Sequence, residues 1–95
     1  MKVLFFTSLR EITGKREELI DLSDKDKITI TSILEILTKR FGKSFREYVY
    51  SPKTKTVKGF LQFLVNGNSI QPPNILQASL TDGDVLAILP PVGGG

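Results

Sequence analysis

The 95-residue sequence contains no cysteine and no histidine. Without cysteine the chain has no disulfide, no thiol nucleophile and no thiolate metal ligand. Without histidine it lacks the usual general base near neutral pH and the commonest ligand of transition metals. We therefore do not expect an autonomous hydrolase or transferase, and we predict no metal site and no bound cofactor in this chain.

Long hydrophobic runs are also absent. The sequence is 40% hydrophobic and 24% charged, which is ordinary for a globular domain, and its apolar runs are too short to span a membrane. Lys2 precedes an apolar run, but Thr7, Ser8 and Arg10 interrupt it, so the run is shorter than the hydrophobic region of a signal peptide. We expect one small, soluble, cytoplasmic domain with no membrane partner.

The charge is weakly basic, at +3, and does not indicate a nucleic-acid partner. Lys53, Lys55 and Lys58 fall in a segment rich in Pro and Thr, with no pattern of stacking aromatics beside them. A solvated loop is the expected structure for Ser51 to Lys58. A second basic group surrounds a predicted helix C-terminus, where cations suit the helix dipole: Lys39, Arg40, Lys43 and Arg46.

The first half of the chain predicts two strands and a helix. Lys2 to Ser8 is rich in β-forming residues, and its parity points Phe6 outward with Lys2. Arg10 to Lys15 is expected to be a turn, and Glu17 to Leu22 the second strand of a hairpin. The helix follows, with Thr29 as a plausible N-cap and Gly42 at its end. Its apolar face has helical spacing: Ile30, Ile33, Leu34, Leu37 and Phe41.

The second half predicts a short helical turn and three strands. Ser44 to Tyr50 can form the helical turn, and Phe60 to Asn66 is a strand whose outward parity includes Leu64. Asn66-Gly67 is a strong hairpin signal, leading into a short strand from Asn68 to Gln71. Thr81 to Asp84 is a turn, since it lacks the length and the closing Glu of a calcium loop.

The last predicted strand, Val85 to Leu89, completes an α+β fold. The helix lies between a hairpin and the later strands, so it is a crossover that places the first and last strands side by side and parallel. This order of elements predicts a β-grasp, ubiquitin-like domain: a mixed sheet packed on one main helix. We expect the domain to cover residues 1–89 and a flexible arm to cover residues 90–95.

The arm follows the last strand without a polar spacer. Pro90 and Pro91 favour an extended chain, whereas Gly93 to Gly95 can enter a channel too narrow for side chains. From Val92 onward the arm can reach roughly 13 Å. The alternative is a frayed glycine-rich end or a cloning remnant. If the arm is functional, the carboxylate of Gly95 is its only chemical group.

Several segments resemble the small subunit of molybdopterin synthase, the MoaD-like family of ubiquitin-related sulfur carriers. The resemblance covers most of the chain, and its specific part is the ending Pro90-Pro91-Val92-Gly93-Gly94-Gly95. The opening Lys2 to Phe6 with Arg10-Glu11, the hairpin Val65-Asn66-Gly67, and Leu80 to Asp84 also resemble the family.

This resemblance implies a carrier and not an enzyme. Gly95 would be adenylated and converted to a thiocarboxylate that donates sulfur to a pterin precursor during molybdenum or tungsten cofactor biosynthesis. ATP with Mg would be used by a ubiquitin-activating-type enzyme, and a persulfide would donate the sulfur. The large synthase subunit would admit the arm and contact Phe6, Leu64 and Leu89.

Other functions fit the same sequence. The chain could be a ubiquitin-like protein modifier joined to lysines, or a sulfur carrier for tRNA or thiamin thiolation. It could also be a ubiquitin-like interaction module that has no chemistry. The sequence does not separate a carrier from a modifier, because both need an activated C-terminal glycine.

Overall fold

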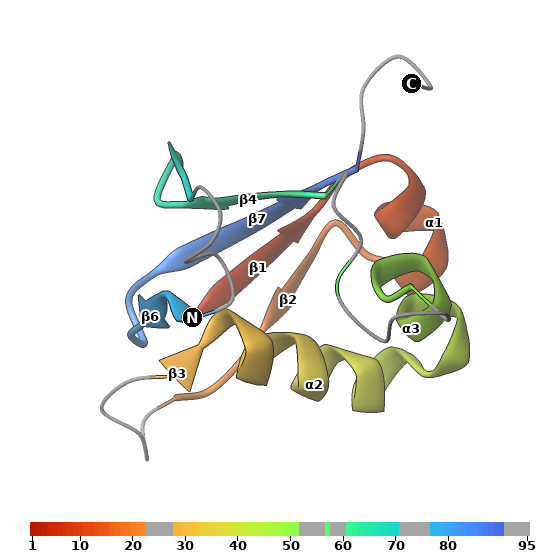
Figure 1. Ribbon diagram of the computed structural model, residues 1–95, viewed down its shortest axis with the longest axis horizontal. Helices are drawn as coiled ribbons and strands as arrows, with labels where there is room; N and C mark the ends of the chain where they lie inside the picture. Colours follow the sequence, from red (N-terminus) through yellow and green to blue (C-terminus); the bar gives the residue numbers. More distant parts are fainter. Residues whose placement is uncertain (23–27, 52–56, 58–60, 71–76, 91–95) are drawn as a thin grey trace.

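The computed structural model describes residues 1–22, 28–51, 57, 61–70 and 77–90. Figure 1 shows the strands and helices of this part of the chain. The strands are β1 (Lys2–Phe5), β2 (Glu17–Leu19), β3 (Ile28–Thr29), β4 (Gln62–Val65), β5 (Asn68–Ser69), β6 (Ser79–Leu80) and β7 (Val85–Leu89). The helices are α1 (Ser8–Thr13), α2 (Ile30–Phe41) and α3 (Lys43–Val49).

Five of these strands form one mixed sheet, in the order β2-β1-β7-β4-β5. The first strand, β1, pairs in parallel with the last, β7, and antiparallel with β2. The parallel pair confirms the crossover expected from the sequence. A separate small sheet joins β3 to β6.

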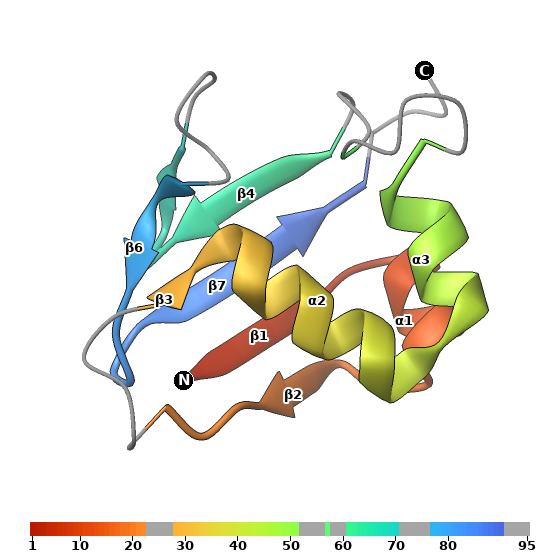
Figure 2. The same ribbon diagram turned by 60° about the horizontal axis from the view of Figure 1, so that its bottom comes forward.

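The main helix, α2, covers one face of the large sheet (Figure 2). Its predicted apolar face is confirmed, because Ile30, Ile33, Leu34 and Leu37 are all fully buried. The predicted cap is also confirmed, since Oγ1 of Thr29 accepts a hydrogen bond from the backbone N–H of Ser32 at 3.3 Å. Gly42 ends the helix at φ 81°, and α3 supplies the predicted extra helical turns.

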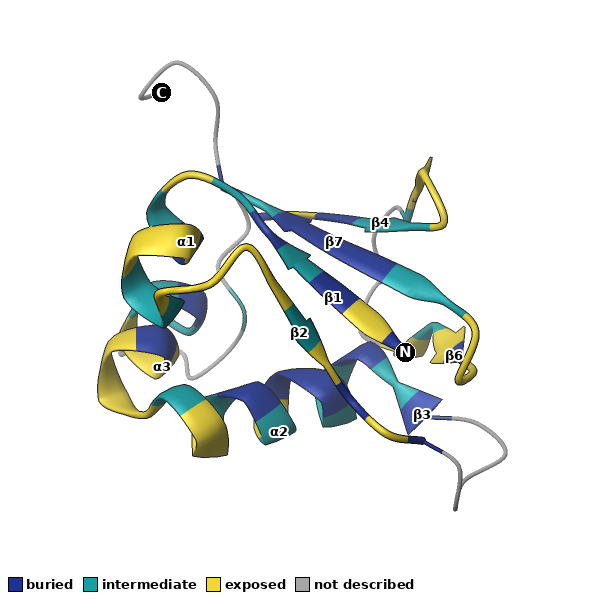
Figure 3. Cartoon of the chain, turned by 180° about the vertical axis from the view of Figure 1, so that it is seen from behind, coloured by how far each residue is buried: buried dark blue, intermediate teal, exposed yellow. Residues whose placement is uncertain are grey.

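The core lies between α2 and the inner face of the sheet. Along β1 the buried and more exposed positions alternate, whereas β7 is buried through its middle three residues (Figure 3). Three aromatic rings close the core where α2 meets α3: Phe5 lies 5.7 Å from Phe41 and 6.4 Å from Phe45, measured between ring centroids. This burial supplies most of the driving force for the fold.

The predictions for residues 2–15 are partly wrong. The first strand ends at Phe5 and not at Ser8, because the backbone turns at Thr7, which has φ 45°. The segment predicted as a turn is the short helix α1, which ends at Gly14. Leu9 on this helix is fully buried in the core, so tertiary packing stabilises a helix too short to be stable alone.

Other boundaries differ as well. The strand predicted from Phe60 to Asn66 is β4, Gln62–Val65, and the strand predicted from Asn68 to Gln71 ends at Ser69. The second strand, predicted to reach Leu22, ends at Leu19, and Ile28–Thr29 forms a strand before the helix begins. A strand of two residues has no detectable period, so neither β3 nor its partner β6 could be predicted. Gln71, the arm from Pro91 to Gly95 and most of the segment from Ser51 to Lys58 lie outside the described residues. Among the described helices, none is long and apolar enough to cross a membrane.

Candidate functional site

The candidate site is the sheet face that points away from α2, together with the arm that follows β7. Strand register shows which side chains share this face. Leu4 and Leu64 both lie opposite Ala87, from β1 and β4 respectively, and Gln62 lies opposite Leu89. Leu64 and Leu89 therefore point to the same side of the sheet.

The face is apolar but only partly exposed. Leu4, Phe6, Leu64 and Leu89 are each half-buried. Ala87, between Leu4 and Leu64, is only 8% exposed, because its small side chain lies below its neighbours. The face thus has a low centre with larger apolar side chains around it, a shape that can accept a projecting group of another protein.

Phe6 lies just beyond the end of β1, and a cation covers it. The guanidinium carbon of Arg10 lies 5.5 Å from the centroid of the Phe6 ring. Nε of Arg10 also donates to the backbone oxygen of Phe5 at 3.1 Å. Helix α1 places Arg10 beside Phe6. Because the sequence did not predict this helix, it did not predict Arg10 as a residue of the site either.

Two other residues of this face were not predicted to be site residues. Leu4 has the same outward parity as Lys2 and Phe6, and this parity could have identified it as a residue of the face. Leu19 is 68% exposed, the largest exposure among the described large hydrophobic residues. It lies opposite Lys2, at the end of β1 farthest from the arm.

The arm begins from a fixed point. Pro90, directly after β7, is buried, so the fold holds the chain up to the first arm residue. The remaining arm residues, Pro91, Val92, Gly93, Gly94 and Gly95, lie outside the described residues, and their roles stay predictions.

The acidic turn before β7 is structural. Oδ1 of Asp82 accepts from the backbone N–H of Leu22 at 3.1 Å and from the ammonium of Met1 at 3.2 Å. These bonds hold the pKa of Asp82 below its usual value. Backbone and side-chain donors, first the N–H of Thr81, also lower the pKa of Asp84. Asp84 thus closes the predicted turn, and Asp82 links that turn to Met1 and Leu22.

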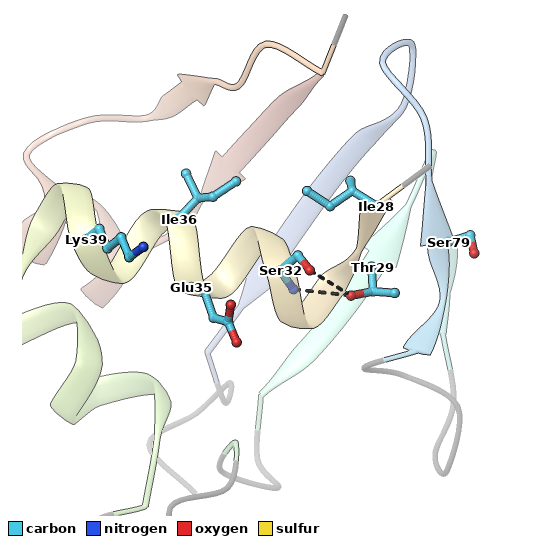
Figure 4. Close-up of a pocket in the computed structure, with 7 residues that line it drawn as sticks. All are labelled: Ile28, Thr29, Ser32, Glu35, Ile36, Lys39 and Ser79. Carbon is cyan, nitrogen blue, oxygen red and sulfur yellow. Dashed lines mark hydrogen bonds between the residues drawn. The ribbon is translucent and has the colours of Figure 1, made fainter. Parts of the chain in front are cut away.

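A shallow hollow of about 420 Å³ lies along the outer side of α2 (Figure 4). Its walls include Ile36 and Lys39 on α2 and Ser79 on β6. Its least exposed polar side chains, those of Thr29 and Ser32, already have hydrogen-bond partners, because they bond to each other at the helix N-terminus. The hollow lies on the opposite side of α2 from the sheet and shares no residue with the candidate site.

Comparison with known proteins decides the family. The sequence profile of the ThiS family matches residues 3–95. This chain belongs to the ThiS family. The molybdopterin synthase sulfur carrier subunit of Chlamydomonas reinhardtii is 28% identical over 95 residues, which cover 100% of this chain and 98% of that protein.

Two solved structures are similar over nearly the whole chain. Small archaeal modifier protein 1 from Methanosarcina acetivorans is 29% identical, with a TM-score of 0.80, covering 99% of this chain and 94% of that one. A chain of the BexX/CysO complex from Amycolatopsis orientalis is 27% identical, with a TM-score of 0.73, covering 99% and 98%. The predicted β-grasp fold is confirmed.

The ThiS family member described here is therefore a ubiquitin-like sulfur carrier of the ThiS/MoaD type. Proteins of this family are small carriers and not catalysts, and they work with partner enzymes.

Proposed function

We propose that this sulfur carrier is the small subunit of a molybdopterin synthase and carries sulfur on Gly95. The observation that supports this most strongly is the similarity to the Chlamydomonas sulfur carrier subunit, which extends over the whole length of both chains. The ending from Pro90 to Gly95, which resembles that family, is a second support.

The chemistry begins with a poor electrophile. The carboxylate of Gly95, with an ordinary pKa of about 3.3–3.7, carries a negative charge at neutral pH that repels nucleophiles. An ATP- and Mg-dependent enzyme of the ubiquitin-activating type transfers AMP to the carboxylate and releases pyrophosphate. A persulfide sulfur then displaces AMP, and a second thiol cleaves the resulting sulfur–sulfur bond, leaving a thiocarboxylate.

The large synthase subunit then admits the arm, and the thiocarboxylate sulfur attacks the pterin precursor. Base and nucleotide site lie on the partners, in a cytoplasmic setting, which agrees with the lack of histidine and cysteine in this chain. The buried Pro90 supports this role, because it gives the arm a fixed origin next to Leu89. Phe6, Leu64 and Leu89 form the surface against which the partner docks.

The test compares the full chain with a chain that lacks Gly95. The deletion shortens the arm by roughly 3.3 Å, and about 1 Å of misplacement can cost on the order of a hundredfold in rate. After incubation with ATP, the activating enzyme and sulfide, intact-protein mass spectrometry should show one oxygen-to-sulfur exchange in the full chain alone. The loaded chain, mixed with the large subunit and the pterin precursor, should then yield molybdopterin.

Two results would contradict the proposal. Equal sulfur loading of both chains would show that the carboxylate of Gly95 is not required to carry the sulfur. A full chain that loads sulfur but gives no molybdopterin would leave a sulfur carrier that serves a different acceptor, such as tRNA or the thiamin precursor.

A protein-modifier role is the second candidate, and the similarity to small archaeal modifier protein 1 favours it. It uses the same activated glycine but joins it to a lysine amine. An affinity-tagged chain recovered from cells with isopeptide-linked adducts, absent when Gly95 is deleted, would support this role.

A further inference from the structure

The edge strand β2 leaves backbone groups that β1 does not use. The N–H of Phe5 donates to the oxygen of Arg16 at 2.8 Å, and the N–H of Ile20 donates to the oxygen of Met1 at 2.9 Å. In an antiparallel pair, groups facing the partner alternate with groups facing away. Because Arg16 and Ile20 face β1, Glu18 does too, and the N–H and C=O of Glu17 and Leu19 face outward. Among the described strands, β2 ends the sheet.

Arg40, near the end of α2, occupies this edge. Its Nη1 donates to the backbone oxygen of Leu19 and to Oε2 of Glu18, each at 2.9 Å. Lys15 holds the other oxygen of the same carboxylate, with Nζ at 2.8 Å from Oε1 of Glu18. The Glu18 side chain is only 11% exposed, so one largely buried carboxylate anchors Arg40 over the carbonyl of Leu19.

We propose that Arg40 and Glu18 together keep the free edge of β2 from pairing with the same edge of a second copy of this chain. An exposed strand edge is a template for another strand, and proteins often protect such edges with charged side chains. Here Arg40 occupies the carbonyl that a second strand needs. A carrier whose arm must enter a partner gains from remaining a single copy.

Three antiparallel registers bring outward-facing groups of β2 together. One places Glu17 opposite Glu17, another places Leu19 opposite Leu19, and the third places Glu17 opposite Leu19 of the second copy. In each of them the carbonyl of Leu19 faces the second copy, so Arg40 obstructs all three.

Glu18 acts through Arg40 and is not a separate barrier, because Lys15 and Arg40 compensate its charge. Arg40→Gln exposes the carbonyl of Leu19. Glu18→Gln removes one of the two bonds that hold Arg40 and leaves its bond to the Leu19 carbonyl.

The experiment compares Arg40→Gln, Glu18→Gln and the double variant by light scattering over a range of concentrations. Arg40→Gln and the double variant should reach twice the mass of the unaltered chain, and Glu18→Gln, which keeps Arg40 on the Leu19 carbonyl, should pair more weakly than either. Residue-resolved amide hydrogen exchange reports whether this edge pairs. In the double variant the amides of Glu17 and Leu19 should become protected, whereas that of Glu18, already bonded to β1, should not change. Lys39→Gln with Glu35→Gln, exposed on the same helix, is the matched control and should stay a single copy.

A folded double variant that remains a single copy, with the Glu17 and Leu19 amides unprotected, would overturn the proposal. A dimer of the unaltered chain with those amides protected would overturn it as well. A measurement on the unaltered chain keeps the proposal testable if a variant does not fold. Rotation of the Arg40 guanidinium, followed by nitrogen NMR, should be slow because both bonds hold it, and free rotation would contradict the edge contact itself.

Discussion

Asn66 and Asp84 join the two turns at the same end of β4 and β7: Nδ2 of Asn66 donates to Oδ1 of Asp84 at 2.9 Å. The same amide accepts from the N–H of Val85 at 2.9 Å through its Oδ1. Oδ2 of Asp84 accepts from the N–H of Thr81 at 2.8 Å. One amide and one carboxylate thus fix the start of β7, the strand that leads to the arm.

Asn66→Asp should break this link and lower stability at neutral pH. The new carboxylate still accepts from Val85, but it cannot donate to Asp84 and repels it. We expect the free energy of unfolding in denaturant to fall by about 1–2 kcal/mol at pH 7. The loss should shrink as the pH falls below about 4, where carboxylates become protonated.

The exchanged pair supplies the control for this prediction. Adding Asp84→Asn to Asn66→Asp restores one amide and one carboxylate, and each bond again has a donor and an acceptor. The double variant should recover most of the lost stability. A double variant no more stable than Asn66→Asp would show that the side-chain link contributes little.

The ion pair of Asp82 with the Met1 ammonium should make stability sensitive to acid. The pKa of Asp82 is lower in the folded chain than in the unfolded one, chiefly because the Leu22 N–H bonds to the carboxylate. The stabilisation is therefore fully present above the unfolded pKa and is lost as pH falls through the lower folded pKa. In Asp82→Asn the unfolding free energy should decline less between neutral pH and about pH 2. Identical pH profiles of the two chains would contradict this assignment.

The parts of the fold that could be predicted are those with a local physical cause. Asn66-Gly67 predicts its hairpin because both residues tolerate positive φ, and the structure has φ 52° and 83° there. Thr29 and the apolar face of α2 are similar cases. The helix α1 could not be predicted, since its stability depends on the burial of Leu9 among distant residues.

Side-chain contacts between distant segments could not be predicted either. Glu18 has the parity of a core residue, opposite the buried Val3, and only the structure shows that Arg40 and Lys15 compensate its charge. The candidate site could be predicted in part. Parity indicated which strand residues face outward, but the position of Arg10 over Phe6 depends on α1, which the sequence did not indicate.

Thr7 has an unfavourable backbone conformation, and glycine should relieve it. Its φ of 45° and ψ of −114° are rare for a β-branched residue, and such strain costs on the order of 1–3 kcal/mol. Glycine adopts these angles freely but loses about 0.5–1 kcal/mol through the greater freedom of the unfolded chain. We expect Thr7→Gly to raise the free energy of unfolding by about 1 kcal/mol. Thr7→Ala keeps a Cβ and should gain less, so equal effects of the two substitutions would contradict strain as the cause.

The last prediction places the docking surface by comparing two leucines on the same sheet face. Leu64 lies on β4 beside Ala87, near the arm, whereas Leu19 lies on β2 at the other end of β1. If the partner docks around the arm, Leu64→Ala should weaken binding to the molybdopterin synthase large subunit by about 1–3 kcal/mol. Leu19→Ala should change binding little, although Leu19 is more exposed and the chemical change is the same.

Calorimetric titration of each folded variant with the large subunit measures this difference. Leu89→Ala should resemble Leu64→Ala, because register places both side chains on the same face beside Ala87. Phe6→Ala tests whether the surface extends beyond the end of β1. Leu64 is half-buried, so its substitution should cost the free domain no more than about 1–2 kcal/mol and leave it folded. Equal losses of affinity for Leu64→Ala and Leu19→Ala would mean that the partner covers the whole sheet face. A loss for Leu19→Ala alone would move the docking surface to the β2 edge, which Arg40 occupies.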